Sequence, residues 1–139
     1  MSNVQASLHA FAPETESPAA LCTTLNGALC NNIVPGKFVT LFYGVLDSRS
    51  KRFIFENAGH CQPIVIRKDG RIDVPSSSSG VLGVFPEWTY EDREISLDVG
   101  DCLLLLTDGL IDHQAKMKRN SVLSEWRKCC SAIVIYLPT

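Results

Sequence analysis

The 139-residue sequence has no Cys-x-x-Cys pair, no long apolar run and no excess of basic residues. Apart from the adjacent Cys129 and Cys130, its six cysteines are scattered, which speaks against a zinc site and favours free thiols in a reducing compartment. The longest apolar runs, 102–106 and 132–137, fall far short of the ~20 residues that span a bilayer. The first residues lack the basic and apolar regions of a signal peptide. These absences predict a cytoplasmic protein that does not contact a membrane.

The charge of the chain is nearly balanced but unevenly distributed. Lys and Arg number 13 against 15 Asp and Glu, a net charge of −2, which speaks against binding to a nucleic acid backbone. With 45% hydrophobic and 20% charged residues, the composition is typical of a single globular domain. Residues 1–111 carry 8 basic and 13 acidic side chains, whereas residues 112–139 carry 5 and 2. This change of sign predicts a tail that differs in character from the rest.

Apolar residues recur at helical spacing in two segments near the start of the chain. Residues 3–11 form the first segment, and Pro13 ends it. Ser17 and Pro18 have the chemistry of an N-cap and a first helical residue, and they predict a second helix that ends before Pro35. The apolar positions on which both predictions rest are Val4, Leu8, Phe11, Leu21, Leu25, Ala28 and Leu29.

The segments that follow are rich in β-branched and aromatic residues and are separated by turn signals. The first two predicted strands form a hairpin, and the next two form another across the Asp69-Gly70 turn. The last strand is a continuous apolar run, typical of a strand buried on both faces. Helices followed by antiparallel strands predict an α+β fold, with a sheet packed under helices. The predicted strands are 38–46, 52–56, 64–67, 72–74, 90–97 and 102–106.

Asp108 is the most informative candidate for chemistry, since it follows the last predicted strand between Thr107 and Gly109. A carboxylate at the rim of a sheet, beside a glycine that lets the chain turn, suits a hard cation such as Mg²⁺ or Mn²⁺. A carboxylate at this place equally suits the cap of a following turn or helix. The residues alone leave both interpretations open.

The Asn-Ala-Gly-His segment at 57–60 is the second candidate. His60 suits a general acid, a metal ligand or a pH sensor, because the pKa of histidine lies near neutrality. Asn57 and His60 equally suit hydrogen bonding within a tight turn in which Gly59 supplies an unusual φ, and this structural interpretation is favoured. Residues 80–86 contain glycines without the spacing of a nucleotide-binding loop, so we predict a packed apolar loop there.

Four strings stand in an order and at a spacing that are specific to one protein family. They are FVTLFYGVLD (38–47), NAGHCQP (57–63), GVLGVFP (80–86) and VGDCLLLLTDGLID (99–112). Together with the helical strings NVQASLHAF and SPAALCTTLN, they make residues 2–113 resemble the SpoIIE/RsbU-type branch of the metal-dependent protein serine/threonine phosphatases (PPM). The resemblance implies part of an α-β-β-α sandwich of antiparallel sheets with flanking helices.

The resemblance also implies a function. It implies hydrolysis of phosphoserine or phosphothreonine on a phosphorylated protein, usually an anti-sigma-factor antagonist of the STAS type, in partner-switching signalling. Two Mn²⁺ or Mg²⁺ ions, held by aspartates at the sheet rims, would lower the pKa of a bridging water and orient it for attack. Asp108, within its Thr-Asp-Gly motif, matches a family metal ligand. Asn57, Gly59 and His60 match a family turn, to which we assign no catalytic role.

Two departures from the family pattern bear on the metal site. The family has an upstream aspartate that bridges both metals and an Asp-Asp pair on a last strand, and neither has a counterpart in this sequence. We therefore expect residues 1–113 to form a partial phosphatase domain and residues 114–139 to be a divergent basic tail, of the kind that a shifted reading frame produces. With Asp108 as the remaining ligand, metal binding and turnover are expected to be weak.

Two further expectations follow from the same departures. Without the family's first strands, an exposed sheet edge is expected, and with it self-association of the chain. A non-catalytic module that binds a phosphoprotein and a nonfunctional remnant of gene decay are the alternatives to a phosphatase.

Overall fold

Contacts between residues divide the chain into two units. Unit 1 consists of residues 1–60 and 77–96, and unit 2 consists of residues 61–76 and 97–139. Neither helix in the part of the chain that the structure describes has the length and apolar character of a membrane span. The computed structural model describes residues 2–15, 17–76, 79–106 and 133–136.

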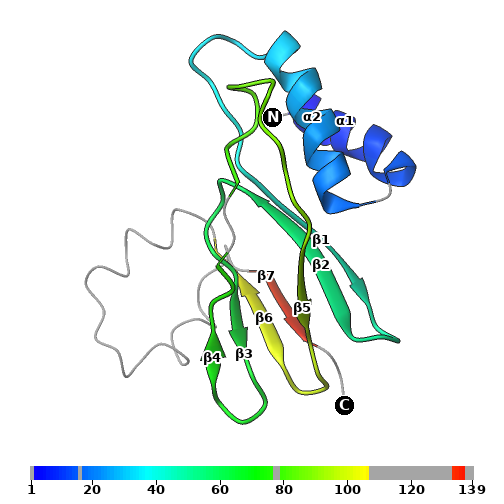
Figure 1. Cartoon of the computed structure of the whole chain (residues 1–139), viewed down its shortest axis with the longest axis vertical. Coiled ribbons are helices and arrows are strands. Elements are labelled where there is room, and N and C mark those ends of the chain that lie inside the picture. The colour runs from blue at the N-terminus through cyan, green and yellow to red at the C-terminus, as the bar shows by residue number, and fades with distance from the viewer. Residues whose placement is uncertain (1, 16, 77–78, 107–132, 137–139) are drawn as a thin grey trace, which may run out of the picture. The chain divides into compact units, whose positions relative to one another are not determined.

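Unit 1 begins with the two predicted helices, α1 at Ser2–Phe11 and α2 at Pro18–Asn32, with the short 3-10 helix η1 at Ala12–Glu14 between them (Figure 1). The predicted N-cap of α2 is confirmed, because the Ser17 hydroxyl accepts a hydrogen bond from the main-chain N–H of Ala20 at 3.2 Å. Proline at the first helical position has no N–H to leave unpaired, so the sequence around Ser17 starts the helix at little cost.

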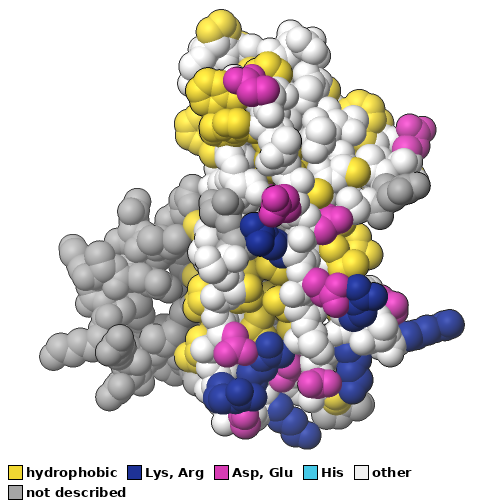
Figure 2. Space-filling view, in the orientation of Figure 1, with side chains coloured by type: hydrophobic (Ala, Val, Ile, Leu, Met, Phe, Trp, Pro, Cys, Tyr) yellow, Lys and Arg dark blue, Asp and Glu magenta, His cyan; other side chains and the backbone are white. Residues whose placement is uncertain are grey.

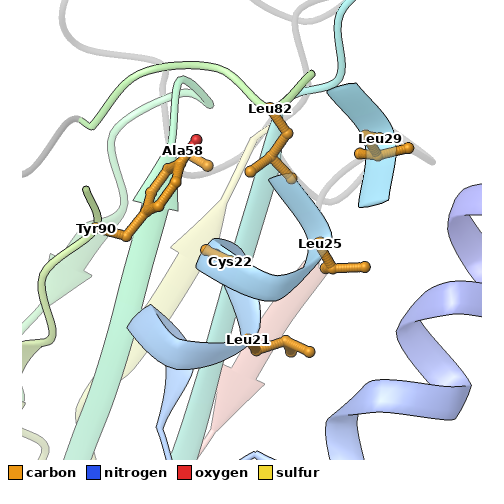
Figure 3. Close-up of a cluster of buried hydrophobic side chains, with 7 residues drawn as sticks. All are labelled: Leu21, Cys22, Leu25, Leu29, Ala58, Leu82 and Tyr90. Carbon is orange, nitrogen blue, oxygen red and sulfur yellow. The ribbon is translucent and has the colours of Figure 1, made fainter. Parts of the chain in front are cut away.

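Three antiparallel strands form the sheet of unit 1, in the order β1-β2-β5 (Figure 1). Their bounds are Leu41–Asp47 for β1, Arg52–Ala58 for β2 and Arg93–Ser96 for β5. Helix α2 packs on this sheet, and the apolar stripe predicted for the helix is buried apart from the half-buried Ala28. Figure 3 shows the resulting cluster converging from α2, from β2 and from the segment before β5: Leu21, Cys22, Leu25, Leu29, Ala58, Leu82 and Tyr90.

Four antiparallel strands form the sheet of unit 2, in the order β4-β3-β6-β7. Adjacent Leu103 and Leu104 on β6 are both almost fully buried, so the prediction of a strand buried on both faces is confirmed. Strand β7 is not among the predicted strands, since a short apolar run does not by itself distinguish strand from helix. The bounds are Ile64–Ile66 for β3, Ile72–Asp73 for β4, Cys102–Leu105 for β6 and Ile133–Tyr136 for β7.

The predicted strands differ from the observed ones mainly at their ends. There the residues form an isolated bridge or pack a side chain into the core instead of pairing in a ladder. The strand predicted from residue 38 begins at Leu41, because Val39 pairs instead with Leu82 as an isolated bridge. The strand predicted from residue 90 begins at Arg93, because the Tyr90 side chain enters the core and its hydroxyl donates to the Val81 carbonyl at 3.3 Å. The predicted α+β class, with antiparallel sheets and flanking helices, is confirmed.

Candidate functional site

The metal ligand predicted at Asp108, with its neighbours Thr107 and Gly109, lies outside the described residues. The described chain leads up to this motif through β6, which ends at Leu105, and through Leu106, which is 4% exposed. The segment that precedes the motif is therefore anchored in the sheet of unit 2.

A site for a divalent metal ion needs several ligating side chains close together. Within residues 2–15, 17–76, 79–106 and 133–136, no group of three or more His, Cys, Asp or Glu side chains is placed to hold one. Since Mg²⁺ and Mn²⁺ sites are built from several oxygen ligands, the described part of the chain does not fit a metal by itself.

Asn57 is fully buried and organises the turn that follows β2. Its Oδ1 accepts a hydrogen bond from the main-chain N–H of His60 at 2.8 Å, and its main-chain carbonyl accepts from the N–H groups of Gly59 at 3.1 Å and Ser79 at 2.8 Å. These contacts close a tight turn and attach it to the chain segment before residue 80.

Gly59 takes a conformation that other residues rarely adopt, with φ +71°. A Cβ atom at this position would lie 2.4 Å from Cγ1 of Val81. The main chain of Gly59 therefore lies so close to Val81 in the 80–86 loop that a larger residue would collide with it.

His60 is half-buried, and its Nδ1 lies 3.3 Å from the hydroxyl of Thr40. Either group can donate in this contact, depending on the tautomer of the imidazole. The main chain of His60 is held by Asn57, and its ring by Thr40, so both described contacts hold the residue within the turn.

Asn26 is not among the predicted site residues, and it fastens the 80–86 loop to α2. Its side chain is 1% exposed, donates from Nδ2 to the Phe85 carbonyl at 2.9 Å and accepts at Oδ1 from the Gly83 N–H at 2.8 Å. The signal in the sequence is a polar residue at an apolar helical position, four residues after Cys22. Buried amides of this kind are retained where both ends of the amide have partners.

Glu56 is a second buried polar residue that sequence analysis missed. The carboxylate is 1% exposed and accepts a hydrogen bond from the main-chain N–H of Glu91 at 3.1 Å. Burial raises the pKa of the neighbouring Cys22 thiol to about 12, and the negative charges of Glu56 and Asp92 add to this effect. Cys22 is therefore an uncharged core side chain at neutral pH.

In unit 2, Asp101 joins the turn before β6 to the β3–β4 hairpin. Its carboxylate accepts from Arg67 Nη1 at 2.8 Å, from the Lys68 N–H at 2.9 Å and from the Asp98 N–H at 3.0 Å. Burial raises the pKa of Asp101, but these hydrogen bonds outweigh it and hold the pKa below its usual value.

The charged residues of this hairpin line a shallow groove of mixed charge in unit 2. Arg67 also pairs with Asp73 at 2.7 Å, and Arg71 pairs with Asp69 at 2.8 Å. Figure 2 shows basic and acidic side chains intermixed on the visible face rather than gathered into patches of one sign. The groove therefore lacks the net positive charge of an anion-binding site.

A model of the family described as stage II sporulation protein E (SpoIIE) matches residues 1–131. The chain belongs to the SpoIIE family. Protein IcfG of Synechocystis is 30% identical over 81 residues, which are 58% of this chain and 13% of that protein. Phosphoserine phosphatase RsbU of Bacillus subtilis is 27% identical over 103 residues, which are 72% of this chain and 30% of that protein. The predicted family is confirmed by the family match. The SpoIIE-family chain spans less than a third of the length of either relative.

Solved structures agree with this assignment. The RsbU and RsbW domains of a Mycobacterium tuberculosis protein match with a TM-score of 0.69 and 26% identity, over 81% of this chain and 31% of that one. The PP2C phosphatase domain of SpoIIE from B. subtilis matches with a TM-score of 0.72 and 16% identity, over 91% and 36%. RsbX in complex with magnesium matches with a TM-score of 0.65 and 19% identity, over 91% and 63%. The last two likenesses bear on the fold alone.

Proposed function

We propose that this SpoIIE-family chain carries part of a metal-dependent phosphatase domain that removes phosphate from phosphoserine or phosphothreonine of a regulatory protein. The proposed substrate is an anti-sigma-factor antagonist of the STAS type, and the proposed setting is partner-switching control of transcription in the cytoplasm. The observation that carries this proposal is the family match over residues 1–131, because it includes the Thr-Asp-Gly motif at 107–109. The relative named phosphoserine phosphatase RsbU supports the choice of reaction.

Within this proposal, Asp108 is a ligand for Mn²⁺ or Mg²⁺. The magnesium complex of RsbX and the manganese-soaked SpoIIE phosphatase domain support the choice of metals. The described residues contribute the sheets and the turn at 57–60, and they do not supply a cluster of carboxylates. We therefore expect the 139-residue polypeptide alone to turn over substrate weakly or not at all.

A second candidate is a non-catalytic module that binds the phosphoprotein and controls it by binding alone. The observation that favours it is the lack of a metal-ligand cluster within the described residues. Both candidates have the same fold. They differ only in whether the chain catalyses metal-dependent hydrolysis of the phosphate.

The experiment that separates the candidates uses the purified 139-residue chain and a phosphoserine form of a STAS-domain protein. Release of phosphate is measured with and without Mn²⁺, and binding of the phosphorylated and unphosphorylated protein is measured by calorimetry. Asp108→Asn is the test variant. Asp112→Asn, at the end of the same 99–112 string, is the matched control.

Mn²⁺-dependent phosphate release that disappears in Asp108→Asn and persists in Asp112→Asn supports the phosphatase. Selective binding of the phosphorylated protein without any turnover supports the non-catalytic module. Phosphate release that Asp108→Asn leaves unchanged overturns the phosphatase. A chain that neither releases phosphate nor distinguishes the phosphorylated protein overturns the non-catalytic module and fits the third alternative, a nonfunctional remnant.

A further inference from the structure

The 79–86 segment, which is Ser79 together with the 80–86 loop, is held by a buried asparagine toward each end. Toward its start, the Ser79 N–H donates to the main-chain carbonyl of Asn57 at 2.8 Å. Toward its end, the Asn26 side chain bonds two main-chain groups of the loop, at 2.8 and 2.9 Å. The segment therefore connects helix α2 with the end of strand β2, two parts of unit 1 that are distant in the sequence.

The middle of this segment is paired with the residue that precedes Thr40. The main-chain N–H and C=O groups of Leu82 and Val39 exchange two hydrogen bonds, at 2.8 and 3.0 Å. The hydroxyl of Thr40 in turn lies 3.3 Å from Nδ1 of His60. The imidazole of His60 is therefore attached to the segment through Thr40 and its neighbour.

The main chain of His60 is attached to the same segment by a second route. Asn57 Oδ1 accepts a hydrogen bond from the His60 N–H at 2.8 Å, and the Asn57 carbonyl accepts from the Ser79 N–H. Within this turn, Gly59 lies against Val81, since a Cβ atom at position 59 would be 2.4 Å from Cγ1 of Val81. Both the ring and the main chain of His60 thus depend on where the segment lies.

Both anchors and the middle of the segment are shielded from water. Asn26 and Asn57 are 1% and 0% exposed. Leu82, also 0% exposed, packs in one cluster with Leu29 of α2 and Ala58 of β2 (Figure 3). Breaking a buried hydrogen bond leaves polar groups without a partner, because water does not reach them. Contacts of this kind open together with their neighbours, as cooperative units of the fold.

We propose that the 79–86 segment couples helix α2 to the turn at 57–60, so that α2 at Asn26, the segment and His60 open as one unit. Asn26 is then a positioning residue for His60, because loss of its two hydrogen bonds releases the segment that holds both the ring and the main chain of His60. An event that displaces α2 reaches the imidazole by this route. The coupling needs neither a metal ion nor phosphate, so it does not depend on the proposed phosphatase function.

Amide hydrogen exchange of the full 139-residue chain, followed by NMR at several urea concentrations, tests whether these parts open together. In the unmodified chain, the amides of Ser79, Gly83 and His60 should show one common opening free energy and one common dependence on urea. This measurement needs no variant, so it tests the proposal whether or not a substitution at Asn26 folds.

Asn26→Ala removes the anchor on α2. Exchange of the Ser79 and His60 amides should then rise about tenfold relative to the amides of the β1–β2 ladder. The nitrogen chemical shifts of the His60 imidazole should move toward those of Thr40→Val, which lacks the hydroxyl that contacts the ring. The matched control is Asn31→Ala, at an exposed position of the same helix, and it should leave both readouts unchanged.

Common opening in the unmodified chain, together with faster exchange at Ser79 and His60 in Asn26→Ala, supports the proposal. Different opening free energies for the three amides overturn it. Unchanged exchange at Ser79 and His60 in Asn26→Ala, or an unchanged imidazole shift, also overturns it, because the loop is then fastened to α2 without affecting His60. An equal rise across the β1–β2 ladder overturns it as well, since the variant then acts on the whole of unit 1.

Discussion

Single residues in this SpoIIE-family chain act mainly by setting where the main chain turns. Gly59 has φ +71° and no space for a Cβ atom, whereas Gly36 has φ +83° and nothing within 4 Å of the position of a Cβ atom. The two glycines therefore separate two physical effects, the strain of a left-handed backbone and the collision with a neighbour.

We expect Gly59→Ala to lower the free energy of unfolding by about 2–4 kcal/mol, because it adds a collision with Val81 to the backbone strain. Gly36→Ala should cost only the strain, about 1–2 kcal/mol. Urea unfolding of both variants measures the difference. Equal losses in the two variants would show that the contact between Gly59 and Val81 is unimportant.

Elements of the fold are joined by a few buried polar side chains. Asn26 connects α2 to the 80–86 loop, and Asp101 connects the turn before β6 to the β3–β4 hairpin. Each makes two or more hydrogen bonds to groups far away in the sequence, so removing the side chain leaves buried partners unsatisfied.

For α2 and the 80–86 loop, we expect Asn26→Ala to lower the free energy of unfolding by about 2–3 kcal/mol. The matched control is Asn31→Ala on the same helix, since the exposed Asn31 side chain donates only to the Gly27 carbonyl at 3.0 Å. The control should change stability by about 0.5 kcal/mol or less. Urea unfolding and the exchange rate of the Gly83 amide measure both effects, and an unchanged Gly83 rate in Asn26→Ala would refute the anchoring role.

For the β3–β4 hairpin, we expect the stabilisation by Asp101 to depend on pH. Its pKa is lowered in the folded chain, so the contribution of the carboxylate is complete above its ordinary pKa of about 3.9 and is lost as the pH falls through the folded pKa. Asp101→Asn should therefore destabilise the chain at pH 7, and its difference from the unmodified chain should shrink below about pH 4.

The measurement is urea unfolding of both proteins from about pH 7 to about pH 2. Asp69→Asn is the control, because Asp69 pairs with Arg71 on the surface, where ion pairs contribute little. A stability difference for Asp101→Asn that stays constant with pH would contradict the expectation.

At the scale of the whole molecule, acidic and basic side chains of the described residues pair with one another rather than gather by sign. The net charge is −2, and the ion pairs of the described residues stand at several separate places, such as Arg52 with Glu94 and Arg71 with Asp69. Carboxylates that are paired in this way are not grouped to hold a divalent cation.

We expect about 1 mM Mn²⁺ to raise the melting temperature of the 139-residue chain by less than about 2 °C, because a site with a dissociation constant near 1 mM contributes only about 0.4 kcal/mol. Differential scanning calorimetry with and without Mn²⁺ measures the shift. A rise of more than about 5 °C that vanishes in Asp108→Asn would reveal a complete metal site and contradict this prediction.

Much of the local structure could be predicted from the sequence, because local signals determine it. Ser17 and Pro18 start α2, the Asp-Gly pair turns the β3–β4 hairpin, and the leucines of β6 form a buried strand. For the candidate site, the Thr-Asp-Gly motif and the turn at 57–60 were named from the sequence. The Asn57 contacts are those of a turn, and the metal role of Asp108 stays a prediction.

By itself, the sequence determined the α+β class and the order of the elements from α1 to β6, because hydrophobic spacing, caps and turn residues act over a few positions. Its four ordered strings indicated the family. Only the tertiary structure decided that Asn26 holds a loop 57 and 59 residues away, that β7 pairs with β6 and that β2 lies between β1 and β5. These features depend on contacts between distant segments, and nothing in the local pattern of either segment specifies its partner. Burial and hydrogen bonding across the folded chain make that choice.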